Sequence, residues 1–400
     1  MPITRDQRRT LLDQRRALKM ARSVHAYVRG NTARFYEWLA ASDVAKDVPL
    51  GPSIWICGDC HLGNLGPLAD VNHRVDVQIR DLDQTVVGNP ALDLIRLALS
   101  LETAARSSDL PGVTTARMIE AVIDGYLRAL SPQESDEPVE PDVVKSVRRR
   151  AAGRRWKHLA RERIADEEPA IPIGKRFWAL TTDERAGIDK LFGDPDVRDR
   201  ALALADLGPK GRLRVLDAAY WRKGCSSLGR LRYAVLLGVA RNKSAPEHLA
   251  LVDIKEAVHP VAPSDPQAPM PSDPAERVIA GAKALAPNLG DRMIAARLFG
   301  KPVVLRELAP QDLKVEVDQF NRKEAVAAAG YLAFVVGIAH GRQMTDEKRV
   351  EWSKKLKARR EQNLKAPSWL WRSVVELAAT HEAGYLEHCR QFAMAANRKR

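Results

Sequence analysis

Hydrophobic residues change their spacing several times along the N-terminal part of the chain. Apolar side chains recur at helical intervals over residues 4–42, which predicts helices there. The run 54–57 is continuously apolar and ends at a glycine, which predicts a short buried strand. Apolar and polar residues alternate over 75–79, which is the spacing of a half-buried strand. A proline at the start of the segment 90–105 then opens a predicted helix.

Strand patterns dominate the chain beyond residue 206. They follow an acidic, proline-rich linker over 131–142 and a helical pattern over 181–206. A helical pattern over 274–286 interrupts the strands, and the residues after 310 are helical throughout. The predicted strands cover 213–222, 230–239, 249–257, 292–298 and 302–308.

This order of elements predicts an α+β protein in which a small antiparallel sheet accompanies a larger helical portion. A chain of 400 residues is long for one compact domain, which favours two or three folding units or two lobes around a cleft. The predicted segments are helices with polar loops over 1–130, a charged linker and helical insertion over 131–205, a strand-rich unit over 206–309, and further helices over 310–400.

The composition limits the class of protein. Apolar residues at 45% and charged residues at 29% exclude a wholly disordered or fibrous chain. The 64 Lys and Arg exceed the 51 Asp and Glu by 13, which favours anionic partners. The apolar stretch 325–339 is too short to span a bilayer, which needs roughly 20 residues. Residues 1–22 lack the apolar core of a signal peptide, and four cysteines give no disulfide framework, so we expect a cytoplasmic protein.

The most informative polar segment is 57–64, with the sequence CGDCHLGN. Its Asp59 and Asn64 follow a predicted buried strand, as in a phosphoryl-transfer loop, where the Asp orients the attacking hydroxyl or accepts its proton and the Asn oxygen binds Mg²⁺. The next predicted strand ends at Asp81, which would be a second metal ligand, and Asp83 is a possible third. Mg²⁺ favours few carboxylates together with phosphate oxygens, so these residues predict Mg²⁺ with ATP. In the alternative interpretation, Asp59 and Asn64 shape a turn and Asp81 caps a strand.

These motifs resemble the protein-kinase-like superfamily, especially its aminoglycoside phosphotransferase branch. That branch carries G-D-x-H-x-x-N, an Asp at the end of the next strand, and a Gly-Asp-Pro-like turn before a helix that contains an Asp. Here the turn is 88–90 and the helical residue is Asp93. The resemblance implies a bilobal kinase-like fold in which Asp59 is catalytic and Asn64 and Asp81 bind the metal. It also makes Asp93 a buried support of the catalytic loop.

The resemblance assigns nucleotide binding to the strand-rich unit. A glycine-rich hairpin would bring backbone N–H groups close to the phosphates. Lys255 would pair with the phosphates, and Glu276 on the following helix would hold Lys255. The strand over 302–308 would contact adenine through the backbone of Glu307 and Leu308. The hairpin residues assigned to ATP are Gly224, Ser226, Ser227 and Gly229.

The motif order differs from that of an ordinary kinase, because the nucleotide-binding strands follow the catalytic loop. The whole pattern is similar to a bacterial family, domain of unknown function 2252, which has a G-D-x-H-x-x-N segment, an Asp-x-Asp strand end, and later a glycine loop and a V-K-E-A strand. The segments 19–30 and 338–342 are also similar to that family. This resemblance implies a circularly permuted kinase-like fold, in which the chain begins in one lobe, builds the other and returns to the first.

Two segments allow other interpretations. Cys57, Cys60 and His61 could bind zinc or act in redox chemistry, although a structural zinc site needs four ligands and the other cysteines are distant. In the kinase-like family His61 would be structural, and Cys57 replaces the usual histidine. The basic run 145–163 could bind nucleic acid, form a solvated helix face balanced by neighbouring acids, or cap the cleft and contact the acceptor.

The leading hypothesis is an ATP- and Mg²⁺-dependent phosphotransferase that acts on an unidentified hydroxyl of a small molecule or protein. Nucleotidyl transfer on the same fold is one alternative, and a non-catalytic scaffold that binds nucleotide or nucleic acid is another. Arg29 and the segment 340–342 are further candidates for contacts with anions.

Overall fold

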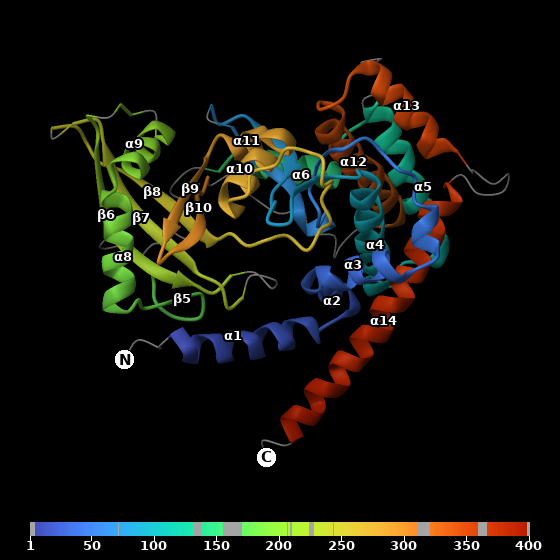
Figure 1. Ribbon diagram of the computed structural model, residues 1–400, viewed down its shortest axis with the longest axis horizontal. Coiled ribbons are helices and arrows are strands. Elements are labelled where there is room, and N and C mark those ends of the chain that lie inside the picture. Colours follow the sequence, from blue (N-terminus) through green and yellow to red (C-terminus); the bar gives the residue numbers. More distant parts are fainter. Residues whose placement is uncertain are drawn as a thin grey trace.

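A computed structural model gives the structure of the protein. It describes residues 5–70, 72–131, 138–154, 170–205, 207–208, 210–223, 228–242, 244–309, 312, 321–358 and 366–397. These residues form a mixed α+β structure that has a strand-rich part and a helical part (Figure 1), which confirms the predicted α+β class.

The strand-rich part is built around a six-stranded sheet with the order β5-β6-β7-β8-β10-β9. All neighbouring strands are antiparallel, as predicted. Each predicted strand of this block is present to within a few residues, whereas β5 was not predicted. The bounds are β5 (Phe177–Trp178), β6 (Arg212–Trp221), β7 (Arg232–Ala240), β8 (His248–Glu256), β9 (Met293–Leu298) and β10 (Lys301–Glu307).

The two faces of this sheet have different neighbours. Successive residues of a strand point to opposite faces, so Val252 and Ile254 of β8 lie in the core beneath α8 (Thr182–Gly193) and α9 (Pro195–Leu204). Lys255 lies on the other face, where α10 (Pro274–Leu285) packs, followed by α11 (Pro287–Gly290). The helical patterns predicted over 181–206 correspond to α8 and α9, and Asp194 caps the second one, which begins at Pro195. Both helices, predicted as part of an insertion, pack on the sheet.

The helical part contains two small antiparallel sheets as well as helices. The strands are β1 (Ile54–Ile56) paired with β4 (Val86–Gly88), and β2 (Leu65–Ala69) paired with β3 (Val75–Ile79). The helices are α2 (Val24–Gly30), α3 (Thr32–Ala41), η1 (Val44–Asp47), η2 (Leu62–Asn64), α4 (Ala91–Ser107), α5 (Gly112–Ala129), α6 (Asp142–Ala152), α12 (Arg322–Gly341), α13 (Asp346–Lys357) and α14 (Ser368–Asn397).

A glycine contact brings α5 and α12 close together in the core. A Cβ atom added at Gly125 would overlap with the backbone of Gly330, so the two helices can approach this closely only because residue 125 has no side chain. Because α5 precedes the strand-rich segment and α12 follows it, the core of the helical part needs segments from both sides of that segment.

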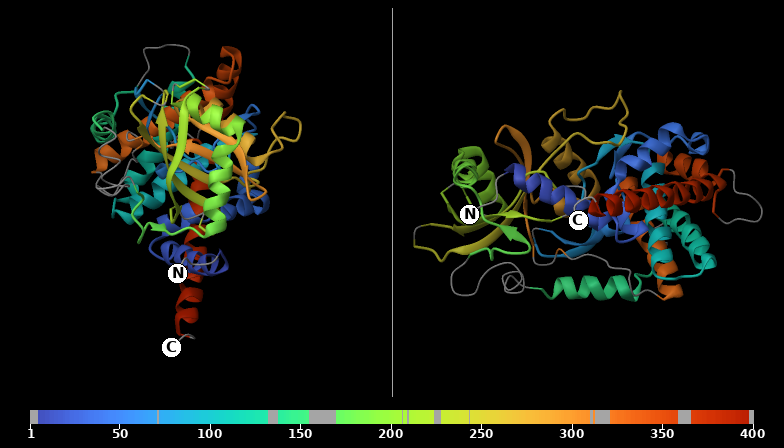
Figure 2. Two further views of the ribbon diagram at one scale, coloured as in Figure 1. Left: turned by 90° about the vertical axis from the view of Figure 1, so that its left-hand side faces the viewer. Right: turned by 90° about the horizontal axis from the view of Figure 1, so that it is seen from below.

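The first helix, α1 (Arg5–Met20), runs below both parts, from the sheet towards α2 (Figure 1). Its buried Arg8 donates from Nη1 to Oε1 of Glu184 on α8 at 2.6 Å, and Leu12 lies in the core of the sheet. Its second half meets α14, where the His388 ring lies 2.9 Å from the Ala17 carbonyl oxygen (Figure 2). The segment 1–130 therefore does not belong to the helical part alone.

One helix among the described residues, α12, is long and apolar enough to cross a membrane by length and composition. The greater share of its most apolar window, 61%, is buried inside the protein, as in the core helix of a soluble protein.

Candidate active site

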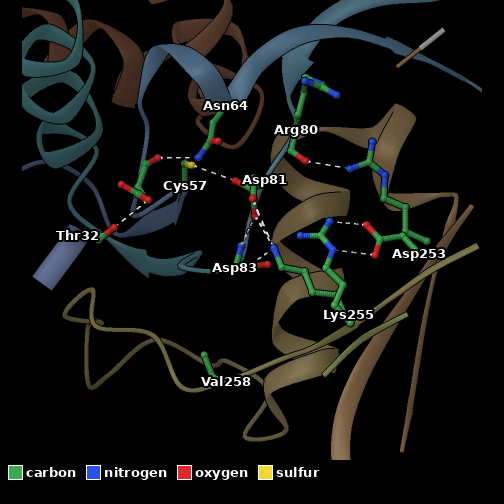
Figure 3. A network of polar contacts seen from close by, with 12 residues as sticks. Thr32, Cys57, Asn64, Arg80, Asp81, Asp83, Asp253, Lys255 and Val258 are labelled. Atoms are coloured by element: carbon green, nitrogen blue, oxygen red, sulfur yellow. Dashed lines mark hydrogen bonds and ion pairs between the residues drawn. The ribbon is translucent and has the colours of Figure 1, made fainter. Parts of the chain in front are cut away.

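A cavity of about 130 Å³ lies between the face of β8 that carries Lys255 and the loops of the helical part. Four of the predicted site residues line it: Asn64, Asp81, Asp83 and Lys255. They come from segments almost two hundred positions apart in the sequence, and the fold brings them together (Figure 3). The remaining lining residues are Gly63, Arg80, Leu82, Lys223, Arg232, Asp253, Val278, Leu289, Met293, Val304 and Arg306.

The loop after β1 carries both Asp59 and Asn64, but only Asn64 lines this cavity, and Asp59 lies deeper in the same loop. Asp59 is 8% exposed, and its two carboxylate oxygens accept from Arg96 Nε at 2.8 Å and from Thr32 Oγ1 at 2.9 Å. Asn64 donates from Nδ2 to the Asp59 carbonyl at 3.0 Å, which leaves its Oδ1 as the atom available to a metal. Burial raises the pKa of Asp59, and Arg96 and Thr32 offset only part of this effect.

Asp93 holds the start of this loop in place. It is 1% exposed, and its oxygens accept from the backbone N–H groups of Cys57 at 2.7 Å and Gly58 at 3.0 Å. Gly58 has a φ of 72°, and a Cβ there would overlap with the Gln84 carbonyl, so the turn requires glycine. The expectation that Asp93 is a buried support of the loop is confirmed.

His340 was one candidate for an anion contact, with a structural role as the alternative, and in the structure it is a buried neighbour of Asp93. Its Nε2 lies 3.2 Å from Asp93, and its Nδ1 lies 2.9 Å from the hydroxyl of Tyr126. That hydroxyl also accepts from the indole of Trp352 at 3.2 Å. The side chain of His340 has no exposed surface, so it cannot reach an external anion and instead continues the support of the loop.

Lys255 forms an ion pair with both carboxylates at the end of β3. Its Nζ lies 3.3 Å from Oδ1 of Asp81 and also contacts Oδ2 of Asp83 (Figure 3). Desolvation in the cleft opposes ionisation of Asp81, but Lys255, with Arg232 behind it, holds its pKa below the usual range. Burial and then the charge of Asp81 raise the pKa of Asp83. The side chain of Asp81 is 45% exposed, so its carboxylate remains accessible from the cavity although it is paired with Lys255.

Sequence reasoning missed a second buried ion pair in the cavity wall. Arg232 on β7 donates to both oxygens of Asp253 on β8, at 3.0 and 2.6 Å. Nearby, the Lys223 ammonium lies over the ring of Trp221 at 4.2 Å, and burial, followed by Arg232, lowers the pKa of Lys223 well below its usual value. The available signal was a charged residue inside an otherwise apolar strand, because burying such a charge requires a partner.

Glu276 is not brought to Lys255. It lies in the first turn of α10 and is exposed, because Ala275, Val278 and Ile279 turn the buried face of the helix towards β9 and β10. The next residue, Arg277, points inward and donates to the carbonyls of Thr85, Asp83 and Val258. The helix is therefore attached to the Asp83 segment through Arg277.

The predicted nucleotide contacts of the strand-rich part are only partly described. Gly224, Ser226 and Ser227 lie outside the described residues, and Gly229 has a φ of 92°, a conformation that favours glycine. The backbone N–H of Glu307 donates to the Arg292 carbonyl at 3.2 Å, and that of Leu308 donates to the Leu251 carbonyl at 2.9 Å. These two N–H groups thus already have partners within the protein and are not offered to adenine here.

The cysteine motif forms part of the loop support. Within the described residues, Cys57, Cys60 and Asp93 have possible ligand atoms within 4.8 Å of one another, whereas His61 is not in the group. A hydrogen bond with Cys60, followed by burial, raises the pKa of the Cys57 thiol. A structural zinc site needs four ligands, and this group offers only three. The Cys57 thiol is protonated, and the Asp93 carboxylate already accepts hydrogen bonds from two backbone N–H groups.

The described part of the basic run 145–163 belongs to α6. This helix buries Val144, Val147 and Ala151, and its Arg148 forms a two-pronged ion pair with Glu140 at 2.8 Å. Residues 155–163 lie outside the described residues. The described portion is therefore a packed helix whose polar face is partly neutralised by the acidic linker.

No curated protein and no solved structure matches the chain. A family model described as "Uncharacterized protein conserved in bacteria (DUF2252)" matches residues 8–391. The match covers nearly the whole chain, and the protein therefore belongs to the DUF2252 family.

Proposed function

We propose that this protein is an ATP- and Mg²⁺-dependent phosphotransferase with a circularly permuted, bilobal kinase-like architecture. The observation that carries the proposal is the meeting of Lys255 with Asp81 and Asp83 beside Asn64 and the Asp59 loop. A buried Lys, two carboxylates, an Asn and a further Asp are the parts that phosphoryl transfer requires. ATP would bind between the strand-rich and helical parts, and the cytoplasm is the compartment in which we expect it to act.

The order of elements in the strand-rich part supports this architecture. The glycine-rich segment joins β6 to β7, Lys255 lies on the third strand of this meander, and α10 follows. Kinases have the same succession of glycine loop, lysine strand and helix. Here the succession follows the Asp59 loop, and α12 then completes the core of the helical part, as a permuted chain would require.

The oxygen donors in the cavity fit a magnesium ion. Asn64 Oδ1 and the carboxylates of Asp81 and Asp83 are hard ligands, and few in number, as Mg²⁺ prefers when phosphate oxygens complete its coordination. Bound there, the ion would neutralise charge on the nucleotide phosphates. Lys255 now neutralises the same two carboxylates, and its ammonium group is within reach of phosphates that enter the cavity.

In the proposed reaction, the acceptor hydroxyl oxygen forms a bond to the γ-phosphorus of ATP. The bond between this phosphorus and the β–γ bridging oxygen breaks, and ADP leaves with that electron pair. The hydroxyl proton passes to the Asp59 carboxylate and then to water. Arg96 and Thr32 hold that carboxylate in one orientation, so much of the catalysis is positioning.

Product analysis tests the reaction class. We expect the full-length protein, incubated with ATP, Mg²⁺ and a cell metabolite extract, to release ADP together with a phosphorylated product detected by mass spectrometry. Release of pyrophosphate and an adenylylated product would replace phosphoryl transfer with nucleotidyl transfer. Nucleotide binding without turnover would favour the scaffold alternative.

The variant Asp81→Asn should weaken Mg²⁺-dependent nucleotide binding by at least about tenfold, because a metal ligand loses its charge. Calorimetric titration of ADP with and without Mg²⁺ measures this effect. Asp76→Asn is the matched control, since Asp76 lies on the same segment and is exposed. Equal loss of affinity with and without Mg²⁺ would contradict a metal role for Asp81.

The pH dependence of turnover should reflect the ionisation of the Asp59 carboxylate. The proposed role needs the ionised carboxylate, so activity falls as the pH drops through the pKa of Asp59. Because that pKa is raised, the acid limb lies above the pH expected for an ordinary Asp. Arg96 lowers this pKa, so Arg96→Gln should move the acid limb of kcat to higher pH. An acid limb that stays in place or moves to lower pH would contradict this assignment.

A further inference from the structure

The junction of α2 and α3 contacts the loop that carries Asp59 through Arg29 and Thr32. Arg96, which binds Asp59, also donates to the carbonyl of Val28 at 2.7 Å, and Thr32 donates to Asp59 directly. Between these two contacts, Arg29 lies on the backbone of Gly63. A Cβ atom at Gly63 would be 2.7 Å from Arg29 Nη2, so the missing side chain leaves room for the guanidinium.

Arg29, which lies against Gly63 of the cavity lining, differs from the arginines near the cavity in having no partner among the described residues. Within the described residues, Arg96 pairs with Asp59, Arg232 pairs with Asp253, and Arg292 and Arg306 share Asp312. Arg29 makes no ion pair or hydrogen bond with any described residue, although it is partly buried and its Nε has no exposed surface. The protein thus leaves the buried Nε of Arg29 without compensation for its lost hydration, whereas the two terminal nitrogens are not buried in this way.

The neighbouring His61 is also an unsatisfied polar group. It is 5% exposed, and among the described residues its Nδ1 has no hydrogen-bond partner. Burial, followed by the charge of Arg29, lowers the pKa of His61 well below its usual value, so the imidazole is neutral at pH 7. The carboxylates nearby are already paired, Asp59 with Arg96 and Asp81 with Lys255, so they do not neutralise Arg29.

We infer that Arg29 binds an oxyanion, a phosphate or carboxylate group, of the acceptor substrate. The class of acceptor rests on the proposed phosphotransferase function, whereas the oxyanion site itself does not. The planar guanidinium can bind two oxygens of such a group at once. Because Gly63 directly precedes Asn64 in the loop that carries Asp59, an acceptor held by its anionic group would have its hydroxyl near the Asp59 carboxylate.

Anion titration of the full-length protein tests the site. Every protein compared in this titration carries Lys255→Met. Without the Lys255 ammonium, Asp81 and Asp83 repel anions, so the titrated anion does not bind at the proposed nucleotide site. Inorganic phosphate and acetate are titrated separately by calorimetry. We expect Arg29→Gln to weaken binding of the tighter anion by roughly 10- to 100-fold, as for loss of a charge-assisted hydrogen bond. The preferred anion distinguishes a phosphate group from a carboxylate.

The matched control is Arg22→Gln, which removes an exposed arginine just before α2 and should change the affinity less than about twofold. Arg29→Lys keeps the positive charge but lacks the planar guanidinium that binds two oxygens at once, so this variant should bind the anion with intermediate affinity. Thermal melting verifies that each variant is folded. Saturable binding that is unaffected by Arg29→Gln, or no binding of either anion, would overturn the inference. If ADP with Mg²⁺ fails to bind the unaltered protein while the Arg29-dependent site persists, the proposed function alone fails.

Discussion

Asp59→Asn should slow phosphoryl transfer by roughly 10²- to 10⁴-fold while nucleotide affinity changes little. The amide keeps the size of the carboxylate and can still accept from Thr32, but it cannot take the proton of the acceptor. Residue 59 is not one of the proposed Mg²⁺ ligands, so the Asp59→Asn variant should still bind Mg²⁺ and nucleotide. Single-turnover rates with the acceptor identified by product analysis, together with calorimetric ADP titration, separate the two effects.

The same substitution leaves the guanidinium of Arg96, which is 1% exposed, opposite a neutral group. Loss of one member of a buried ion pair is destabilising, so the melting temperature of Asp59→Asn must be measured and the assays run below it. The control is Asp109→Asn. Asp109 is exposed and has a φ of 53°, which Asn tolerates as well as Asp. A folded Asp59→Asn protein with full activity would remove Asp59 from the mechanism.

Asp93→Ala should lower the free energy of unfolding by about 3–5 kcal/mol. The change removes the acceptor of two buried backbone N–H groups and of the His340 ring at once, and water cannot replace the carboxylate at a position with so little exposed surface. Chemical denaturation monitored by circular dichroism measures the loss. Asp93→Asn retains one acceptor oxygen and should lose less.

The exposed Asp76 gives the comparison for this prediction, since Asp76→Ala should change the free energy of unfolding by less than about 0.5 kcal/mol. A loss below about 1 kcal/mol in Asp93→Ala would mean that the loop keeps its shape without the carboxylate. In that case the contacts seen at Cys57 and Gly58 would not be what positions Asp59.

Local patterns in the sequence predicted many of the regular elements, although α5 was not predicted despite its regularly spaced buried residues. The alternation over 75–79 gave β3, and the apolar run before Gly58 gave β1. The strand β2 was missed because its segment 65–69 contains Gly66 and Pro67, which are both uncommon inside strands. The pair of residues in β5 is too short to produce any period.

The candidate site was predictable where the residue types themselves carry the chemistry. Asp59, Asn64 and Asp81 follow strand ends, and Lys255 interrupts an apolar strand, so each stands out in the sequence. The ion-pair partners of Lys255 were harder to predict from the sequence. The expected pairing with Glu276 came from the resemblance to kinases, although the apolar positions of α10 already turn Glu276 away from the sheet.

Pairings between distant segments could not be derived from the sequence. Nothing local to Arg232 identifies Asp253 as its partner, and nothing local to Arg29 shows that it lies on Gly63 without a carboxylate. Such contacts depend on the register of neighbouring strands and on how the helices pack, and both are set by the whole fold.

The contact between Asp93 and His340 spans 247 positions and has a consequence for biosynthesis. During translation, the loop that carries Asp59 leaves the ribosome long before the helix that completes its support. The sheet, whose strands lie within 177–307, can assemble in the meantime because its pairings are local within that interval. The nascent protein would thus form its strand-rich part first, and the loop that carries Asp59 would become ordered only after α12 has been made.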